Sequence, residues 1–205
     1  MSRIGWARAA LQFTTTELLI GASNQTRRDK ATGGLATQYV RRQRQVDGAW
    51  ERGAGGGWQF VPSGVTYRAQ GATAHDRILD LAARASEYRA GNCGENAAVA
   101  YRFVHQALVE GRITEPIGRV SYCMCREPGD HAFVVIAEAD DRVPHLRSPG
   151  TVICDPWGGV VMTGSQLDAR AGTALLKVRK SDISVRRLQC YILRHGATVI
   201  SSFRA

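Results

Sequence analysis

Three residues of this chain have the types and the order that nucleophilic amide chemistry requires, and the first is Cys93. It lies in the segment GNCGENAA, at the expected first turn of a helix. Backbone N–H groups without helical acceptors and the positive end of the helix dipole lie there, and both favour the thiolate over the thiol. The same N–H groups can stabilise the oxyanion that forms when a thiolate attacks a carbonyl. The sequence therefore presents Cys93 as a candidate nucleophile.

The other two residues are a histidine and an aspartate farther along the chain. A cysteine nucleophile needs an imidazole to take and return its proton, and the imidazole needs a polar partner that fixes its ring. His131 opens an apolar strand, whereas Asp155 closes another apolar strand just before a proline. Neighbouring antiparallel strands bring the start of one beside the end of the other. We therefore expect His131 to be the general base and then acid, and Asp155 to orient it.

The segments GNCGENAA, DHAFVVI and CDPW together resemble the papain-like cysteine hydrolases, and most of all their bacterial toxin and effector branch. That branch contains thiol proteases, transglutaminase-like enzymes and protein-glutamine deamidases. The resemblance covers residues 76–161. It implies a papain-like fold and a catalytic triad of Cys93, His131 and Asp155. It also implies a protein substrate in a target cell, modified by glutamine deamidation or proteolysis without a metal or other cofactor.

This sequence departs from the family's pattern at the oxyanion hole. The family's upstream glutamine has no clear counterpart, because Gln70 is too far back to assign and Asn92 also fits a helix cap. The second oxyanion donor stays open, with Asn92 and Gly94 as the neighbouring candidates. Gly94 leaves room for a substrate, and Trp157 is a candidate wall of the substrate cleft. Glu95, in the first helical turn, is expected to stabilise the helix start.

Two other function classes remain as alternatives. Cys-Gly-Glu resembles the Cys-Ala-Glu of zinc-dependent nucleobase and nucleoside deaminases, in which the cysteine binds zinc and the glutamate moves the proton. Those enzymes also need a downstream Pro-Cys-x-x-Cys, and the available pair, Cys123 and Cys125, has one intervening residue and no preceding proline. The third class is a non-enzymatic interaction protein whose triad is accidental. Loss of thiol reactivity on His131→Ala would separate the triad from this third class.

Composition and charge limit the kinds of partner that we expect. The 205 residues carry five cysteines and are 44% hydrophobic, which supplies a core without a disulfide framework and fits a reducing compartment. Residues 1–60 contain nine basic and four acidic side chains, and residues 174–205 contain seven and one. Basic ends of this kind are solvated surface or a secretion and targeting tail, and the remaining alternatives are contact with an anionic membrane or with nucleic acid. The basic residues form no stripe with interleaved aromatics, so we expect no specific nucleic-acid partner.

The sequence also bears on localisation. No window approaches the roughly 18 apolar residues of a membrane-spanning helix. The first residues are interrupted by Gln12 and Glu17 and make a poor Sec signal peptide. Together with the resemblance, this favours a secreted virulence effector or toxin that a specialised, non-Sec system delivers into a target-cell cytoplasm. The alternative is a cytoplasmic protein of the producing cell.

We expect two parts in the chain. Residues 1–60 are basic and glycine-rich and predict a partly flexible leader, with one helix near residues 7–20 and a flexible joint at residues 51–60. Residues 61–205 predict a single papain-like catalytic domain, whose folded part begins near Val65.

Within that domain, helical spacing appears before strand patterns. Apolar residues recur at helical intervals over residues 74–89 and again from about Asn92 to Gly111. Beyond Gly118 the pattern changes to short strands. They are expected at residues 119–125, 131–138, 151–156, 159–163, 174–180, 188–194 and 197–203, the last three forming a meander. Helices followed by strands predict an α+β fold, with the helices packed on one face of an antiparallel sheet and the nucleophile at a helix N-terminus.

Overall fold

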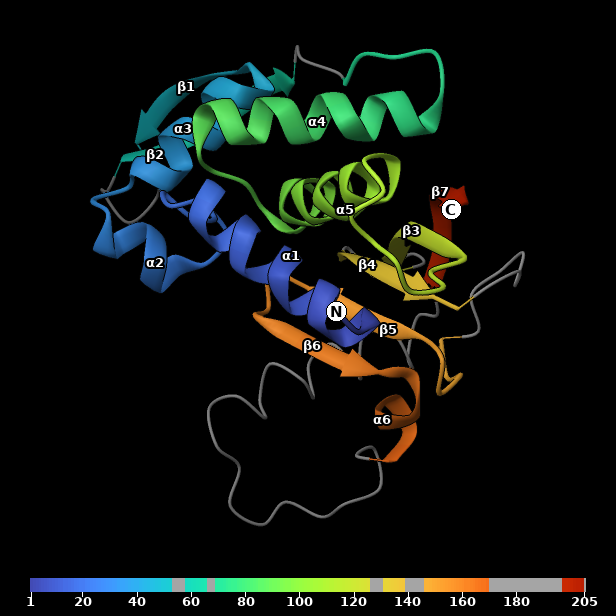
Figure 1. Ribbon diagram of the computed structural model, residues 1–205. Helices are drawn as coiled ribbons and strands as arrows, with labels where there is room; N and C mark the ends of the chain where they lie inside the picture. The colour runs from blue at the N-terminus through green and yellow to red at the C-terminus, as the bar shows by residue number, and fades with distance from the viewer. Residues whose placement is uncertain (53–57, 66–68, 126–130, 139–145, 170–196, 205) are drawn as a thin grey trace.

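A five-stranded antiparallel sheet forms the centre of the fold, and helices cover one of its faces (Figure 1). The protein is described by a computed structural model over residues 1–52, 58–65, 69–125, 131–138, 146–169 and 197–204. Within these residues the strand order is β6-β5-β4-β3-β7, and each neighbouring pair is antiparallel. The predicted α+β class is confirmed.

The helices and strands have the following bounds. The helices are α1 (Arg3–Glu17), α2 (Thr26–Ala31), α3 (Leu35–Arg44), α4 (Ala74–Tyr88), α5 (Cys93–Val109) and α6 (Gly164–Ala169). The strands are β1 (Val46–Arg52), β2 (Trp58–Val65), β3 (Arg119–Cys125), β4 (Ala132–Ala137), β5 (Val152–Asp155), β6 (Val160–Thr163) and β7 (Ala197–Arg204). No helix among the described residues is long and apolar enough to cross a membrane.

The strand predictions hold where the structure describes them. β3 to β6 match the four runs predicted between residues 119 and 163. The strand predicted at residues 197–203 is β7, which pairs with β3. The strands predicted at 174–180 and 188–194, and with them the test of the meander, lie outside the described residues. Because β4 pairs with β5 in antiparallel register, the start of β4 and the end of β5 lie at the same edge of the sheet.

Helix α4 begins and ends where its local sequence predicts. Its N-cap residue is Thr73, whose Oγ1 accepts the backbone N–H of Asp76 at 3.1 Å. The carboxylate of Asp76 accepts the backbone N–H of Thr73 at 3.0 Å in return, which satisfies two N–H groups at the helix start. Arg89 then adopts φ 54° and ends the helix.

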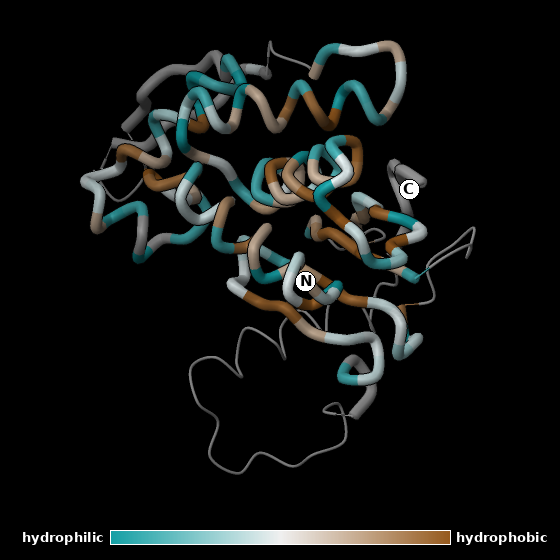
Figure 2. The backbone as a smooth tube through the Cα atoms, in the orientation of Figure 1, coloured by the Kyte–Doolittle hydropathy of each residue, from teal (hydrophilic) through white to brown (hydrophobic). Residues whose placement is uncertain are grey.

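Helix α5 lies inside the molecule, between α4 and the sheet. Every residue from Glu95 to Tyr101 is buried, so the helix is enclosed on all sides along this stretch. Figure 2 shows hydrophobic positions along α5 and the central strands, where these elements face one another. The small side chains of Ala97, Ala98 and Ala100 let neighbouring backbones approach closely, which holds the N-terminus of α5 in a fixed place.

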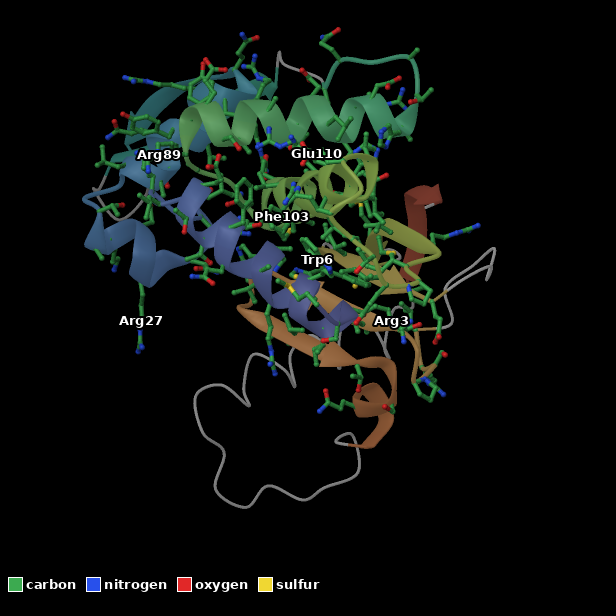
Figure 3. All side chains as sticks on the ribbon, viewed as in Figure 1. Arg3, Trp6, Arg27, Arg89, Phe103 and Glu110 are labelled. Atoms are coloured by element: carbon green, nitrogen blue, oxygen red, sulfur yellow. The ribbon has the colours of Figure 1, made fainter. Side chains whose placement is uncertain are left out.

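The N-terminal helix belongs to this core, which differs from the expected separate leader. Trp6, Ala7 and Ala10 of α1 lie in the same hydrophobic cluster as α5 and the sheet. The rings of Trp6 and Phe103 lie between α1 and α5 with their centroids 6.2 Å apart (Figure 3). The folded unit therefore starts near the beginning of the chain rather than near Val65.

The rest of the predicted leader also forms regular structure. β1 and β2 pair as an antiparallel hairpin, with Arg52 opposite Trp58. The predicted flexible joint at residues 51–60 therefore includes paired residues on both sides, and residues 53–57 lie outside the described chain.

Candidate active site

The start of α5 presents Cys93. Asn92 is the N-cap of the helix, and Cys93 is its first residue. The turn before the helix is fixed by Asn96, whose Nδ2 donates to the carbonyl oxygens of Gly91 and Asn92 at 2.7 and 2.8 Å. Cys93 is half-buried, whereas Cys123, Cys125 and Cys154 are buried free thiols. The predicted position of Cys93 at a helix N-terminus is confirmed.

His131 and Asp155 meet at the sheet edge where β4 begins and β5 ends. Nε2 of His131 lies 2.9 Å from Oδ2 of Asp155, and both side chains are buried. His131 also forms a side-chain hydrogen bond with Cys93. The structure thus brings together the three residues predicted as a triad.

The charge state of His131 follows from these contacts. Burial lowers the pKa of His131, but hydrogen bonds to Asp155 and Cys93 and the negative charges of both partners outweigh it and raise the pKa to about 10. The imidazole is therefore protonated at neutral pH, and it can donate a hydrogen bond to the Cys93 sulfur. The pair can supply both a nucleophile and an acid.

The tight turn after β5 holds the carboxylate of Asp155. The backbone N–H of Gly158 donates to Oδ1 of Asp155 at 3.0 Å, which leaves Oδ2 for His131. A Cβ atom at position 158 would lie 2.5 Å from Oδ2 of Asp155. Glycine is therefore required for the carboxylate to sit against the turn. Cys154, the neighbour of Asp155 in β5, points to the opposite face of the sheet, where its Sγ donates to the carbonyl oxygen of Ala7 at 3.3 Å.

Trp157 lies beside the imidazole. Its ring meets the His131 ring edge-on, with centroids 5.4 Å apart and an interplanar angle of 64°. The indole Nε1 donates to Oδ1 of Asn24 at 2.9 Å, and the Trp157 carbonyl oxygen accepts from Nε2 of Gln25 at 2.7 Å. Trp157 thus forms one side of the site, and residues from the N-terminal part of the chain hold it there.

Asn92 and Gly94, the other two candidates, flank Cys93. Oδ1 of Asn92 accepts from Oγ of Ser23 at 2.9 Å, and its backbone N–H donates to Glu95 at 3.0 Å. These are the contacts of a helix cap tied to the N-terminal segment. Gly94 faces Tyr122, whose hydroxyl donates to the Gly94 carbonyl oxygen at 3.4 Å. Burial raises the pKa of Tyr122, so the hydroxyl keeps its proton.

The contacts of Glu95 indicate a structural role. It is 2% exposed, and its carboxylate accepts from Nε and Nη2 of Arg44 at 2.7 and 2.8 Å as well as from the Asn92 backbone. The carboxylate therefore caps α5 and anchors α3 to it, as its place in the first helical turn predicts.

The remaining described cysteines lie in apolar surroundings. Burial raises the pKa of Cys123 to about 12 and that of Cys125 to about 11, and it raises the pKa of Cys154 as well. Cys123 and Cys125 share one core cluster, as their spacing along a strand predicts. In the described part of the chain, no three His, Cys, Asp or Glu side chains gather as a metal site.

Comparison of the chain with protein-family models, with curated proteins and with solved structures finds no match. The geometry of the site itself therefore carries the functional argument.

Sequence reasoning missed the N-terminal contribution to this site. Ser23, Asn24 and Gln25 contact Asn92 and Trp157, which lie between 68 and 133 residues away in the chain. Short polar residues in a loop carry no local signal of such partners. The one clue in the sequence is the pair of loop amides, Asn24 and Gln25, which could bond to a tryptophan in a turn.

Proposed function

We propose that the protein is a cysteine hydrolase that cleaves an amide bond with a Cys93–His131–Asp155 triad. The observation that carries this proposal is the chain of contacts from Cys93 to His131 and from His131 to Asp155, at the first residue of a buried helix. The same contacts support the papain-like interpretation of the fold. The proposed substrate is a protein in a target cell, to which a specialised system delivers the enzyme.

Acylation begins from the Cys93 thiolate beside the His131 imidazolium. The thiolate of Cys93 attacks the amide carbon, a C–S bond forms, and the carbonyl electron pair moves to oxygen. N–H groups of the first turn of α5 stabilise this oxyanion. As the oxyanion collapses, the C–N bond breaks and the imidazolium of His131 gives its proton to the departing nitrogen. The products of this half-reaction are a thioester on Cys93 and a free amine or ammonia.

Deacylation reverses these roles. His131, now neutral, takes a proton from a water molecule as the water oxygen attacks the thioester carbon. Collapse of the second oxyanion breaks the C–S bond, releases a carboxylic acid and restores the thiolate beside the imidazolium. Asp155 keeps the imidazole in one orientation during both steps. Ammonia leaves in glutamine deamidation and a peptide amine leaves in proteolysis, so the triad serves either reaction.

The environment of Glu95 favours this proposal over a zinc-dependent deaminase. A deaminase would use Glu95 to move protons, but Arg44 and the Asn92 backbone already hold its carboxylate. The hydrogen bond between the His131 imidazolium and the Cys93 sulfur likewise supports a role for the sulfur as nucleophile. A protein that merely binds a partner has no need of such a buried, ordered triad.

The test compares the wild-type protein with Cys93→Ala in lysate of a target cell, followed by mass spectrometry of the lysate proteins. Glutamine converted to glutamate would identify a deamidase, and new peptide ends would identify a protease. Glutamine joined to an amine would identify transamidation from the same thioester. Identical lysates for the two proteins would contradict the hydrolase proposal.

A further inference from the structure

The N-terminal segment of residues 20–25 connects the two halves of the candidate active site. It joins the end of α1 to the start of α2 and runs parallel to the turn that precedes Cys93. The backbone N–H of Ile20 donates to Arg89 at 3.0 Å, and that of Gly91 donates to Gly21 at 3.0 Å. These bonds fix the segment against the turn before the nucleophile.

The same segment then contacts both sides of the triad. On the nucleophile side, Oγ of Ser23 and the backbone N–H of Asn24 donate to Oδ1 of Asn92 at 2.9 and 3.3 Å. On the base side, Oδ1 of Asn24 accepts from the Trp157 indole at 2.9 Å, and Gln25 donates to the Trp157 carbonyl oxygen at 2.7 Å. Asn92 directly precedes Cys93, and Trp157 contacts the His131 ring.

We propose that Asn24 is a positioning residue, which sets the placement of the His131 imidazole relative to the Cys93 sulfur through Trp157. This inference rests on the proposed function, because it concerns the same pair. Asn24 donates to the cap of α5 with its backbone and accepts from Trp157 with its side chain. One residue therefore links the element that carries the nucleophile to the turn that follows Asp155.

The contact between Asn24 and Trp157 affects the chemistry, because the stability of the Cys93 thiolate depends on its distance from the His131 imidazolium. The attraction between two opposite charges weakens as they move apart, so a displaced imidazolium stabilises the thiolate less. Loss of the Asn24 side chain should therefore reduce the thiolate fraction at a pH below the ordinary thiol pKa, where ionisation of Cys93 depends on the imidazolium. At a pH well above the ordinary thiol range, the sulfur is ionised with or without this support.

The experiment measures the rate at which iodoacetamide alkylates Cys93, from about pH 5.5 to about pH 9.5, a range that spans the ordinary thiol pKa of about 8.5. Wild type is compared with Asn24→Ala, Asn24→Asp, Trp157→Phe, the double variant Asn24→Ala/Trp157→Phe and His131→Ala. Asn24→Asp keeps an acceptor for the indole, and Trp157→Phe keeps a ring without the donor. Gln38→Ala is the matched control, because Gln38 is an exposed amide on α3.

For Asn24→Ala we expect the rate near pH 6 to fall about two- to tenfold, the size expected from one hydrogen bond. The rate near pH 9.5 should stay within about twofold of wild type, because the thiol ionises there without help. Asn24→Asp should restore the rate near pH 6. Trp157→Phe should resemble Asn24→Ala, and the double variant should be no slower than either single variant, because both remove the same bond.

Three outcomes would overturn the inference. An Asn24→Ala profile identical to wild type would remove Asn24 from the site while leaving the triad intact. An equal fall at every pH, together with lower thermal stability, would show a structural role alone. A wild-type profile that matches His131→Ala would remove the proposed function, and the positioning role with it.

Discussion

The backbone N–H of Gly158 donates to Oδ1 of Asp155 at 3.0 Å, and a Cβ atom at position 158 would lie 2.5 Å from Oδ2 of that carboxylate. This contact is too short for real atoms, so Gly158→Ala must push the carboxylate away from His131. Displacement of about 1 Å in a catalytic group costs about 100-fold in rate, and we expect a loss of that order in turnover. Gly64→Ala is the control, since a Cβ atom there meets nothing within 4 Å. Unchanged turnover in Gly158→Ala would show that Asp155 does not orient His131.

Asp155→Asn tests the electrostatic part of the same contact. The variant keeps an acceptor for Gly158 but removes a negative charge that holds the pKa of His131 up to about 10. We expect the His131 pKa to fall toward the ordinary value of about 6.5, which an NMR titration of the imidazole would record. Asp76→Asn, at the exposed start of α4, should leave that titration where it is in wild type. A His131 pKa that stays high in Asp155→Asn would contradict the assigned contact.

The raised pKa of His131 also predicts how stability depends on pH. The folded protein holds the proton up to about pH 10, whereas the unfolded chain releases it near the ordinary value of 6.5. The stabilisation from His131 is therefore complete below about pH 6.5, declines as the pH rises from there to about 10, and is lost above that. Guanidinium unfolding of wild type and His131→Gln at several pH values would measure it. The difference in unfolding free energy between wild type and His131→Gln should shrink with rising pH. A constant difference would contradict the ion pair between His131 and Asp155.

The ion pair between Arg44 and Glu95 predicts a stability effect apart from chemistry. Glu95 is 3% exposed in its side chain and Arg44 is 37% exposed, so Arg44→Ala leaves a buried carboxylate without its cation. We expect a loss of about 3 kcal/mol in the free energy of unfolding, at the low end for such pairs because water reaches Arg44. Arg42→Ala, on the same helix over the ring of Tyr39, should cost less than about 1 kcal/mol. Equal losses in the two variants would refute the structural role of Glu95.

Local pattern was enough to predict the elements that carry the triad. The apolar spacing predicted α4 and α5, and the short strand-like runs beyond Gly118 predicted β3 to β6. Because β4 and β5 are neighbours in both sequence and sheet, the meeting of His131 with Asp155 followed from their places at strand ends. These features depend on short-range periodicity and on the pairing of adjacent strands.

The features that were missed depend on distant partners. α1 was expected in a leader because Thr14, Thr15 and Thr16 and several charges dilute its apolar pattern. In the structure each threonine hydroxyl donates to the carbonyl oxygen four residues earlier, so the helix tolerates them and packs in the core. Arg44 with Glu95 and Asn24 with Trp157 are likewise side-chain pairs that no local rule predicts.

We propose that His131 holds Cys93 as a reactive thiolate, and the most direct measurement is the alkylation of each cysteine near pH 6, followed peptide by peptide. At that pH an ordinary thiol, with a pKa of about 8.5, is almost fully protonated. Cys93 should be labelled rapidly, whereas the peptides of Cys123, Cys125 and Cys154 should stay unlabelled, because burial raises the pKa of all three. His131→Ala should slow the labelling of Cys93 by about 10-fold or more, the effect of losing an adjacent positive charge. Equal labelling of Cys93 in wild type and in His131→Ala would show that His131 does not activate Cys93.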